Sequence, residues 1–512
     1  MSKDSEVDMK EVELNEMDME KQPMNTQAMD YPAEKNGCVK VKVPEEMEEK
    51  FTGLSKEELL KVAGTPGWVR TRWALLILFW LGWLGMLAGA IVIIVQAPRC
   101  KPIPEQKWWN KGAMYQISSV ENFQDSNGDG KGDLTGIKNK IDHLEKLKVK
   151  GLILGPIYQS TFGSDTDMLT IDQTLGLKEH FTILLEAAQK KDIGVVLDLT
   201  PDDKNNNPWN NISSPEVQNK LKAAFEHWLT TGIDGIMISQ IEGIKDNAPS
   251  LFDELRNLTD KYTTDTRPRV LIGVTSSKNI AEVVEIQNIS RTDLLLSGIL
   301  QNSGSPPSGS RVALDVQEYI ERLGNSSPAW SVGSRTMGHL SSLVEDRLVR
   351  LYSMMLFTLP GTPFINYGDE IGLSDYSAEN PNTKFPMMLW SGSSNMSVES
   401  QKLDGNSLLN LYIQLSELKV KDRSLKHGDF FTIFHDNNVY AYLREWDQSE
   451  RFLTVLNFGD TQTPVSLKHE KLPAGAEVVL STHPQRQKEH VDLTKLMLEP
   501  SEGLLLRFPY VS

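Results

Sequence analysis

The sequence predicts an α/β protein made of one transmembrane helix, a (β/α)8 barrel and a C-terminal antiparallel β-domain. Three observations support this fold class. Residues 73–95 contain no charged side chain. From residue 108 onward, short strand-like runs alternate with helical patterns, which is typical of βαβ units and a parallel sheet. From residue 422, strand-like runs follow one another with turns between them.

Composition limits the class of protein. The chain has 512 residues, of which 39% are hydrophobic and 24% are charged, and this excludes disorder along the whole chain. A formal net charge of −16 excludes a generally basic nucleic-acid-binding protein. The two cysteines, Cys38 and Cys100, are too few for a disulfide-stapled scaffold or a cysteine-rich zinc domain.

The apolar run at 73–95 is long enough to cross a bilayer, which takes about 20 apolar residues. A buried core helix is the alternative, and a cleaved signal peptide does not fit so long a run so far from the N-terminus. Gly85 and Gly89 form a GxxxG motif, which allows close helix packing but is also ordinary in membrane helices. We predict a signal anchor, with 1–72 as a cytosolic tail and 96–107 as a juxtamembrane linker.

The predicted tail has few aromatic residues and no long periodic run, so it cannot bury enough surface to become ordered. The sequence SKEELLKVAG is a local exception. Ser55 and Glu58 form a capping box there, and Gly64 suits the C-terminal cap. These residues predict a short helix over 56–63.

The orientation of the span follows from glycosylation sequons. Lys and Arg do not decide it, because four lie within the 20 residues on each side. N-x-S/T sequons are all C-terminal to the span, which favours an extracellular C-terminal region and a cytosolic N-terminus. Their asparagines are Asn211, Asn257, Asn288, Asn325 and Asn395.

Cys100 lies five residues beyond the membrane segment and is the only cysteine on the extracellular side of this topology. It therefore forms an intermolecular disulfide or stays a free thiol, and we favour the disulfide. The partner sulfur must also lie close to the bilayer, in a membrane-embedded protein or in a second copy of this chain. Cys38 is expected to stay reduced in the cytosol.

The region from 108 to 421 predicts the barrel. Strand-like runs such as AMYQISSV, GLILGPIY and IGVVLDLT alternate with helical runs such as KEHFTILLEAAQKK and VQNKLKAAFEHWLTTG. About eight such strands over some 300 residues suit a (β/α)8 barrel. The runs FFTIFHD, NVYAYLREW, RFLTVLNFG and GLLLRFP then predict an antiparallel β-domain over 422–512.

Two motifs carry a family resemblance. WWNKGAMYQISSVENFQDSNGDGKGDLTGI resembles the opening of the α-amylase family, in its oligosaccharide-hydrolase branch. LFTLPGTPFINYGDEIGL is similar to that family's eighth strand and the loop after it. The resemblance covers roughly residues 108–512. It implies a barrel whose catalytic carboxylates stand at the C-terminal ends of the strands.

The sequence departs from the family at those strand ends. The family's fourth strand reads G-x-R-x-D and ends in the nucleophile, whereas Met237 and Ser239 stand here in place of Arg and Asp. The acid of the fifth strand corresponds to Val274 or Thr275, and neither is a carboxylic acid. Glu242 follows three positions after Ser239, too far along to keep the register.

The third and seventh strands show the same departure. Asp198 is retained, but Asp202 and Asp203 stand where the family has Asn-His, and Arg335 stands at the Asp of the family's Asn-His-Asp. One carboxylate cannot carry out glycoside hydrolysis, which needs two. The connection after the third strand is also too short for the substrate-covering domain of active relatives. We predict that the chain is not an enzyme, with an active membrane-anchored α-glucosidase as an alternative.

Taken together, these features resemble the heavy chains of heteromeric amino-acid transporters, of the cell-surface-antigen kind. The resemblance implies that Cys100 is bonded to a multi-spanning light chain, which carries the amino acids and also contacts the membrane helix. The heavy chain stabilises this partner and brings it to the plasma membrane. One span is too few for a transport pathway of its own. An adhesion or signalling glycoprotein, with adhesion-receptor partners, is the other alternative.

A loop after the first strand predicts a structural calcium site. Asp125, Asn127 and Asp129 place oxygen ligands at alternate positions around glycines, as hard cations require. The resemblance to active amylase-family members adds the carbonyl of Lys131 and the side chain of Asp133 to this set. A polar turn rich in Asp, Asn and Gly is the alternative. No other cofactor is expected.

Overall fold

The computed structural model describes residues 55–96, 100–158, 167–201, 209, 211–301, 307–324, 326–375, 384–392 and 394–510. They fall into two compact units, one before residue 99 and one from residue 99 onward, and each is described by itself. Four residues named above lie outside the described part, as does most of the predicted tail: Cys38, Asp202, Asp203 and Asn325.

The first unit contains two helices, α1 (Lys56–Ala63) and α2 (Pro66–Gln96). The predicted helix over 56–63 is confirmed. Its capping box is formed, because the N–H of Glu58 donates to Ser55 Oγ and the N–H of Ser55 donates to Glu58 Oε2. α2 begins seven residues before the apolar run, since a proline is well placed in the first turn of a helix.

Within the described part of the chain, α2 is the one helix long and apolar enough to cross a membrane, with a mean hydropathy of 2.4. Every residue of α2 is exposed. Gly85 and Gly89 have open space where a Cβ would stand. A packing role for these two glycines therefore stays a prediction.

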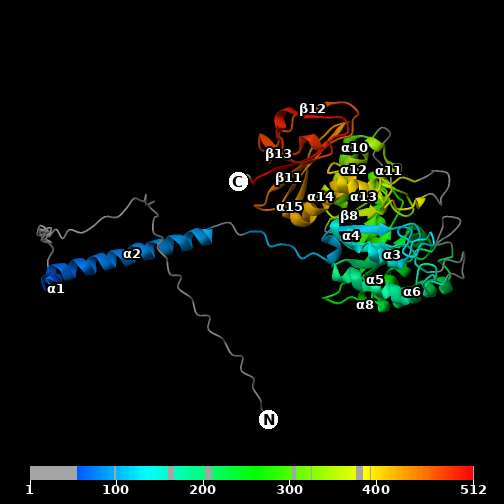
Figure 1. The fold of residues 1–512 in the computed structure, drawn as a ribbon, viewed down its shortest axis with the longest axis horizontal. Coiled ribbons are helices and arrows are strands. Elements are labelled where there is room, and N and C mark those ends of the chain that lie inside the picture. The colour runs from blue at the N-terminus through cyan, green and yellow to red at the C-terminus, as the bar shows by residue number, and fades with distance from the viewer. Residues whose placement is uncertain are drawn as a thin grey trace, which may run out of the picture. The chain divides into compact units, whose positions relative to one another are not determined.

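The second unit begins with the predicted barrel, which is confirmed (Figure 1). Its strands are all parallel and follow the order β6-β5-β4-β3-β2-β1-β8-β7. β6 contacts β7 at the seam, so the barrel is nearly closed. The strands are β1 (Ala113–Ile117), β2 (Val149–Leu154), β3 (Gly194–Asp198), β4 (Gly235–Ser239), β5 (Val270–Val274), β6 (Leu294–Leu296), β7 (Ala329–Trp330) and β8 (Thr362–Asn366).

Helices cover the outside of the barrel. The helices that follow the strands are α3 (Leu134–Asn139), α4 (Ile141–Lys146), α5 (Lys178–Lys190), α6 (Pro215–Thr231), α7 (Glu242–Asn247), α8 (Leu251–Lys261), α9 (Ile280–Ser290), α10 (Gly309–Leu323), α11 (Leu340–Leu343) and α12 (Val349–Thr358). After β8 come α13 (Val398–Leu403), α14 (Leu408–Lys421) and α15 (Arg423–His427).

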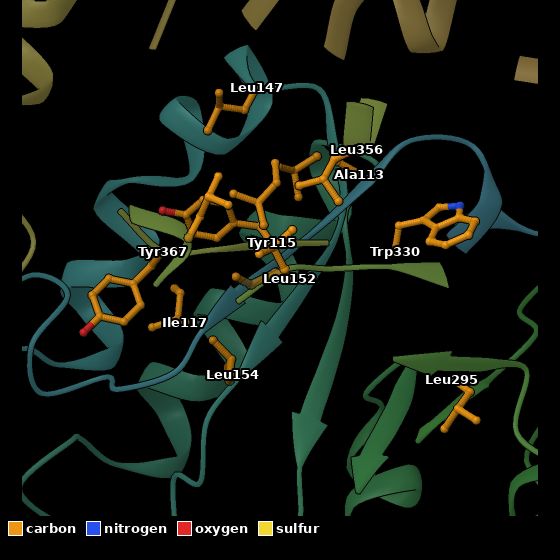
Figure 2. Close-up of a cluster of buried hydrophobic side chains, with 14 of the residues drawn as sticks. Ala113, Tyr115, Ile117, Leu147, Leu152, Leu154, Leu295, Trp330, Leu356 and Tyr367 are labelled. Carbon is orange, nitrogen blue, oxygen red and sulfur yellow. The ribbon is translucent and has the colours of Figure 1, made fainter. Parts of the chain in front are cut away.

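Successive side chains of each barrel strand face opposite sides, as a pleated strand requires. Tyr115 of β1 and Leu152 of β2 point outward and belong to the large core shared with the helices, part of which is drawn in Figure 2. Met114 and Ile153, their neighbours in sequence, belong to a separate cluster inside the barrel. The barrel is therefore a packed core and not an open pore.

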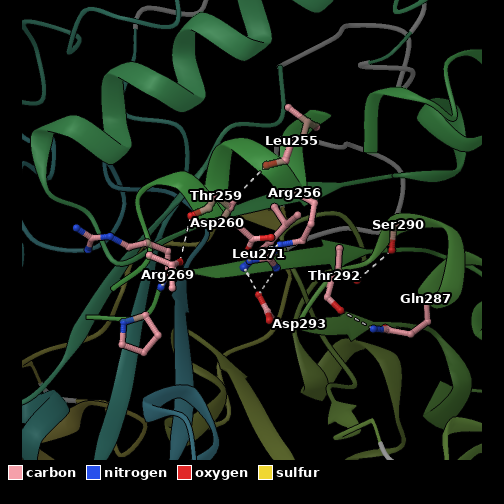
Figure 3. A network of polar contacts seen from close by, with 12 residues as sticks. Leu255, Arg256, Thr259, Asp260, Arg269, Leu271, Gln287, Ser290, Thr292 and Asp293 are labelled. Carbon is pink, nitrogen blue, oxygen red and sulfur yellow. Dashed lines mark hydrogen bonds and ion pairs between the residues drawn. The ribbon is translucent and has the colours of Figure 1, made fainter. Parts of the chain in front are cut away.

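A partly buried arginine connects α8 to the strands beside it (Figure 3). Arg256 pairs with Asp260 one turn along the helix, and its Nη1 lies 2.8 Å from Asp293 Oδ2. The same Asp293 oxygen accepts the backbone N–H of Leu271 in β5 at 2.8 Å. The carboxylates satisfy a cation that would otherwise be costly to bury.

The C-terminal region forms the predicted antiparallel β-domain. One six-stranded sheet has the order β14-β13-β16-β11-β10-β9, and β12 pairs with β15. The strands are β9 (Asp429–His435), β10 (Val439–Glu445), β11 (Arg451–Asn457), β12 (Thr463–Val465), β13 (Gly475–Ser481), β14 (His490–Asp492), β15 (Leu496–Leu498) and β16 (Gly503–Phe508).

Strand β10 packs on both of its faces. Tyr440 and Tyr442 join the core shared with the barrel, whereas Ala441 and Leu443 join the core of the β-domain itself. This period of two explains why the strand is buried throughout most of its length.

Two buried cationic side chains connect the β-domain and α14 to the C-terminal end of α12. Arg444 Nη1 donates to the carbonyl of Thr358 at 2.9 Å, and Lys419 Nζ donates to that of Leu359 at 2.6 Å. These carbonyls lie at the C-terminal end of a helix, where positive charge is favoured. Burial lowers the pKa of Arg444 to about 10. The barrel and the β-domain therefore share one continuous core.

Candidate functional site

The C-terminal ends of β3, β4 and β5 bring three of the predicted positions together. Asp198 ends β3, Ser239 ends β4, and Thr275 follows β5 directly. Asp198 Oδ1 accepts the N–H of Thr200 at 2.9 Å and its hydroxyl at 2.5 Å, and Thr200 Oγ1 accepts the N–H of Ser239 at 2.7 Å. The retained carboxylate is thus held by hydrogen bonds within this mouth of the barrel.

Arg335 reaches the same carboxylate from the loop after β7. Its Nη1 lies 3.5 Å from Asp198 Oδ2, and the Asp198 side chain is fully buried. Met237 is buried inside the barrel, with its sulfur 4.0 Å from the amide nitrogen of Gln116. A cation therefore faces the Asp198 carboxylate, and the Met237 thioether lies beside an amide inside the barrel.

The Glu242 side chain places a carboxylate at this mouth. The alignment with the family's fourth strand gave this residue no role. Its Oε1 accepts the hydroxyl of Thr275 at 2.6 Å and the N–H of Ser276 at 2.7 Å. The side chain thus comes from the start of α7 and reaches across to the end of β5. Its spatial position depends on the loop path, which spacing along the sequence does not specify.

The loop after β8 contains a buried acidic residue with three partners. Glu370 Oε1 accepts the hydroxyl of Tyr115 at 2.9 Å and lies 3.0 Å from His143 Nε2, while Oε2 accepts the N–H of Gly368 at 2.9 Å. Burial and the nearby carboxylate raise the pKa of Tyr115 well above its usual value. The GDEIGL motif therefore fixes the loop to β1 and α4.

A second buried group in this region is His339, whose two ring nitrogens both face acceptors. Nδ1 lies 2.7 Å from Asp375 Oδ1, and Nε2 lies 2.9 Å from the carbonyl of Tyr367. Burial alone would lower the pKa of His339, but its hydrogen bond to Asp375 and the charge of Asp369 outweigh burial and raise it. Burial raises the pKa of Asp369 to about 7.

The predicted calcium loop is built around Asp125. Its Oδ1 accepts the N–H groups of Asn127 at 2.9 Å and Gly128 at 2.7 Å, and its Oδ2 accepts that of Gly130 at 2.8 Å. These donors lower the pKa of Asp125, which is half-buried. The carboxylate is consequently held in its charged form, which is the form a hard cation binds.

The other predicted ligands do not all face the same centre. Asn127 Nδ2 donates to Asp129 Oδ2 at 3.0 Å, and Asp129 Oδ1 accepts the N–H of Lys131. Asp133 instead caps α3 by accepting the N–H of Gly136 at 2.7 Å. Among the described residues, no group of three His, Cys, Asp or Glu side chains is arranged to hold a metal. Calcium binding here stays a prediction.

The opposite, N-terminal mouth of the barrel is covered by Trp108, which directly follows the juxtamembrane linker. Trp108 Nε1 donates to the carbonyl of Pro268 at 2.9 Å. At Gly194, the first residue of β3, a Cβ would stand 2.7 Å from the Trp108 indole, so only glycine leaves room for this ring. The linker is therefore seated on the barrel through an aromatic side chain.

A cavity of about 610 Å³ lies beside Trp108, between the linker and the loops that precede β2 to β5. Two ion pairs stand in its wall, Lys150 with Asp192 and Arg267 with Asp234. It lies at the end of the barrel where this fold places residues for stability and not for catalysis.

The predicted disulfide and glycosylation residues are accessible. Cys100 is exposed and unpaired within the described chain. Four sequon asparagines are described and all are exposed: Asn211, Asn257, Asn288 and Asn395. Their exposure is compatible with modification, which stays a prediction.

Comparison with known proteins identifies the family. A model described as the solute carrier family 3 member 2 N-terminus matches residues 39–115, and one described as the alpha amylase catalytic domain matches residues 119–207. The chain is 46% identical to the amino acid transporter heavy chain SLC3A2 of Oryctolagus cuniculus, over the whole of both proteins. The chain belongs to the amino acid transporter heavy chains.

Other relatives agree with this assignment. The chain is 45% identical to the SLC3A2 heavy chain of Mus musculus over the whole of both proteins. It is 26% identical to the heavy chain SLC3A1 of Rattus norvegicus, over 92% of this chain and 89% of that one. The predicted family resemblance is confirmed. With one apolar helix in the described part of the sequence, the heavy chain fits a single-pass plasma-membrane protein.

Solved structures show the fold of the second unit. The trehalose-6-phosphate hydrolase of Bacillus licheniformis matches with a TM-score of 0.65 and 18% identity, over 79% of this chain and 100% of that one. The trehalulose synthase MutB of Pseudomonas mesoacidophila matches with a TM-score of 0.64 and 16% identity, over the same shares. At these identities the likeness concerns the fold alone.

Proposed function

We propose that this heavy chain forms a disulfide through Cys100 with a multi-spanning light-chain amino-acid transporter, stabilises it and brings it to the plasma membrane. The full-length identity to transporter heavy chains carries the proposal. The region before α2 lies in the cytosol and the barrel lies outside the cell. The exposure of the four described sequon asparagines supports this orientation.

We also propose that the barrel has no hydrolase activity. Ser239 and Thr275 stand at the ends of the strands where glycoside hydrolysis needs its carboxylates, and Arg335 pairs with Asp198. Purified protein should release no more nitrophenol from p-nitrophenyl α-glucoside than its Asp198→Asn variant does. Turnover that this substitution abolishes would overturn the proposal.

Native membranes compared on reducing and non-reducing gels test the partnership. We expect a band that shifts on reduction and that contains, by mass spectrometry, a multi-spanning transporter. The Cys100→Ser variant should lose the shift. A shift to a homodimer would instead favour an adhesion or receptor role, and no shift at all would contradict a covalent partner.

For the loop around Asp125 we propose a structural calcium ion. Asp125, Asn127 and Asp129 belong to one turn, and backbone donors hold Asp125 in its charged form. Calcium would neutralise the repulsion between the two carboxylates and stabilise the loop. Added Ca²⁺ should raise the melting temperature of EDTA-treated protein, and the Asp129→Asn variant should respond less.

A further inference from the structure

The residue after the exposed cysteine is attached to the β-domain at three points. The backbone N–H of Lys101 donates to Asp447 Oδ2 at 3.1 Å. Its Nζ lies 3.1 Å from Asp429 Oδ2 and 5.4 Å from the ring centroid of Trp446. Asp429 begins β9, and Trp446 and Asp447 follow β10 directly. Both the backbone and the side chain of Lys101 are thus held by the same edge of the β-domain.

The far end of the linker is held as well. Gln106 Nε2 donates to the carbonyl of Lys426 at 3.4 Å, and Trp108 is seated on the barrel as described above. The residues between Lys101 and Gln106 therefore span two fixed points. Cys100 directly precedes Lys101, which is the first of these fixed points. The position of Cys100 therefore depends on that of Lys101.

We propose that Lys101 is a positioning residue for the interchain disulfide, because its attachment to Asp429 and Asp447 presents the Cys100 thiol at a fixed place beside the β-domain. This inference rests on the proposed disulfide. A disulfide forms only when the two Cα atoms come within about 4.4–6.8 Å, so a held thiol meets its partner more often than one on a loose tether. Without this contact the cysteine would search a larger volume.

The energetics make this role separable from folding. The side chains of Lys101 and Asp429 are each 54% exposed. An ion pair this exposed contributes little to the free energy of unfolding, because water and salt screen it. Removing it should leave the fold intact, and Cys100 is then held only through the backbone N–H of residue 101, which still donates to Asp447. The effect of this contact on the position of Cys100 can therefore be measured separately from its effect on the free energy of unfolding.

The test follows disulfide formation by the full-length chain in membranes that show the cross-linked band. The membranes are reduced with dithiothreitol, and the reductant is removed. Oxidised glutathione is then added as the two-electron oxidant, which is itself reduced to two thiols as each interchain disulfide forms, and the return of the band is timed on non-reducing gels. For Lys101→Ala we expect the band to return about twofold to fivefold more slowly, the range given by the loss of one exposed ion pair. Lys101→Arg should restore the wild-type rate.

Lys107→Ala is the matched control, since Lys107 is an exposed lysine of the same linker that makes no ion pair with a described residue. It should leave the rate unchanged. If Lys101→Ala relinks as fast as the wild type, the inference is overturned and the proposed disulfide stands. If the wild type shows no linked band, the disulfide and this inference both fail.

Moving the thiol gives a readout that a purely structural role would not affect. Pro102→Cys in the Cys100→Ser background moves the thiol two residues, about 7 Å along an extended chain. With Lys101 intact, this variant should relink more slowly than the wild type, and adding Lys101→Ala should reduce the difference between the two positions. Equal rates at both positions with Lys101 intact would overturn the inference. Labelling of surface protein with a membrane-impermeant maleimide confirms that each variant reaches the surface with its thiol exposed.

Discussion

The two mouths of the barrel differ in what their side chains contact. At the C-terminal mouth, polar side chains contact one another: Asp198 pairs with Arg335, and Thr275 donates to Glu242. At the N-terminal mouth, Trp108 connects the barrel to the linker that leads to the membrane segment. In a hydrolase of this fold the C-terminal mouth binds the substrate. Here Trp108, directly after the linker, contacts the opposite end of the barrel.

At the C-terminal mouth these side chains satisfy one another, so we expect this mouth to contribute stability. The predictions below test this division, in order of decreasing effect.

Removing Arg335 should have the largest effect, because it leaves Asp198 buried without its cation. We expect Arg335→Ala to lower the free energy of unfolding by about 3 kcal/mol. Urea unfolding of the full-length protein in detergent, followed by tryptophan fluorescence, measures it. The Arg335→Ala/Asp198→Asn double variant removes the charge and should recover part of the loss. A double variant less stable than the single one would contradict this account.

The same mouth should lose stability as the pH rises. Burial raises the pKa of Asp369 to about 7, so the folded state keeps a proton that the unfolded chain releases near pH 4. The folded state therefore binds more protons between these values, and the free energy of unfolding falls with rising pH by at most about 1.4 kcal/mol per unit. The raised pKa of His339 acts in the same direction, since its stabilisation is lost above the folded pKa.

Unfolding measured at pH 5, 6 and 7 checks this sign. The Asp369→Asn variant stays neutral throughout, so its stability should depend less on pH than that of the wild type. An Asp369→Asn variant with the wild-type slope would show that other groups cause the dependence.

At the N-terminal mouth, Trp108→Ala should lower the free energy of unfolding by about 2 kcal/mol, less than for a fully buried tryptophan because Trp108 is half-buried. Thermal melting of the full-length protein measures the loss. Trp108→Phe keeps an aromatic ring but loses the hydrogen bond to the carbonyl of Pro268. Its melting temperature should therefore lie between those of the wild type and Trp108→Ala. A melting temperature unchanged in Trp108→Ala would mean that the linker is not seated on the barrel.

The smallest effect concerns the pair at the end of β5. Thr275→Val keeps the shape but removes the hydroxyl that donates to Glu242, and we expect a loss of about 1 kcal/mol. Thr275→Ser keeps the donor and serves as the control. If Thr275→Val and Thr275→Ser were equally stable, the hydrogen bond would make no net contribution to the free energy of unfolding.

Patterns local in the sequence predicted most of the fold. The capping box at Ser55 predicted α1, and the alternation of strand-like and helical runs predicted the barrel strands and the antiparallel sheet. The start of α2 at Pro66 was missed, because polar residues such as Arg70 hide a helix that continues beyond the apolar run. Hydropathy marks the membrane segment and not the ends of the helix.

The candidate site was predictable only in part. Register along β4 and β5 placed Ser239 and Thr275 correctly at strand ends, because strands have a fixed rise. The partners of these positions come from loops, whose paths no local pattern specifies. Glu242, and the contacts of Lys101 with a domain more than 300 residues away, became visible only in the folded chain.

The reach of Glu242 across to β5 also limits which side chains position 275 can hold. A carboxylate placed at position 275 by substitution would meet the charge of Glu242, which already occupies the neighbouring space. A single substitution that introduces an acid here is therefore unfavourable, and a second change, at Glu242, would have to accompany it.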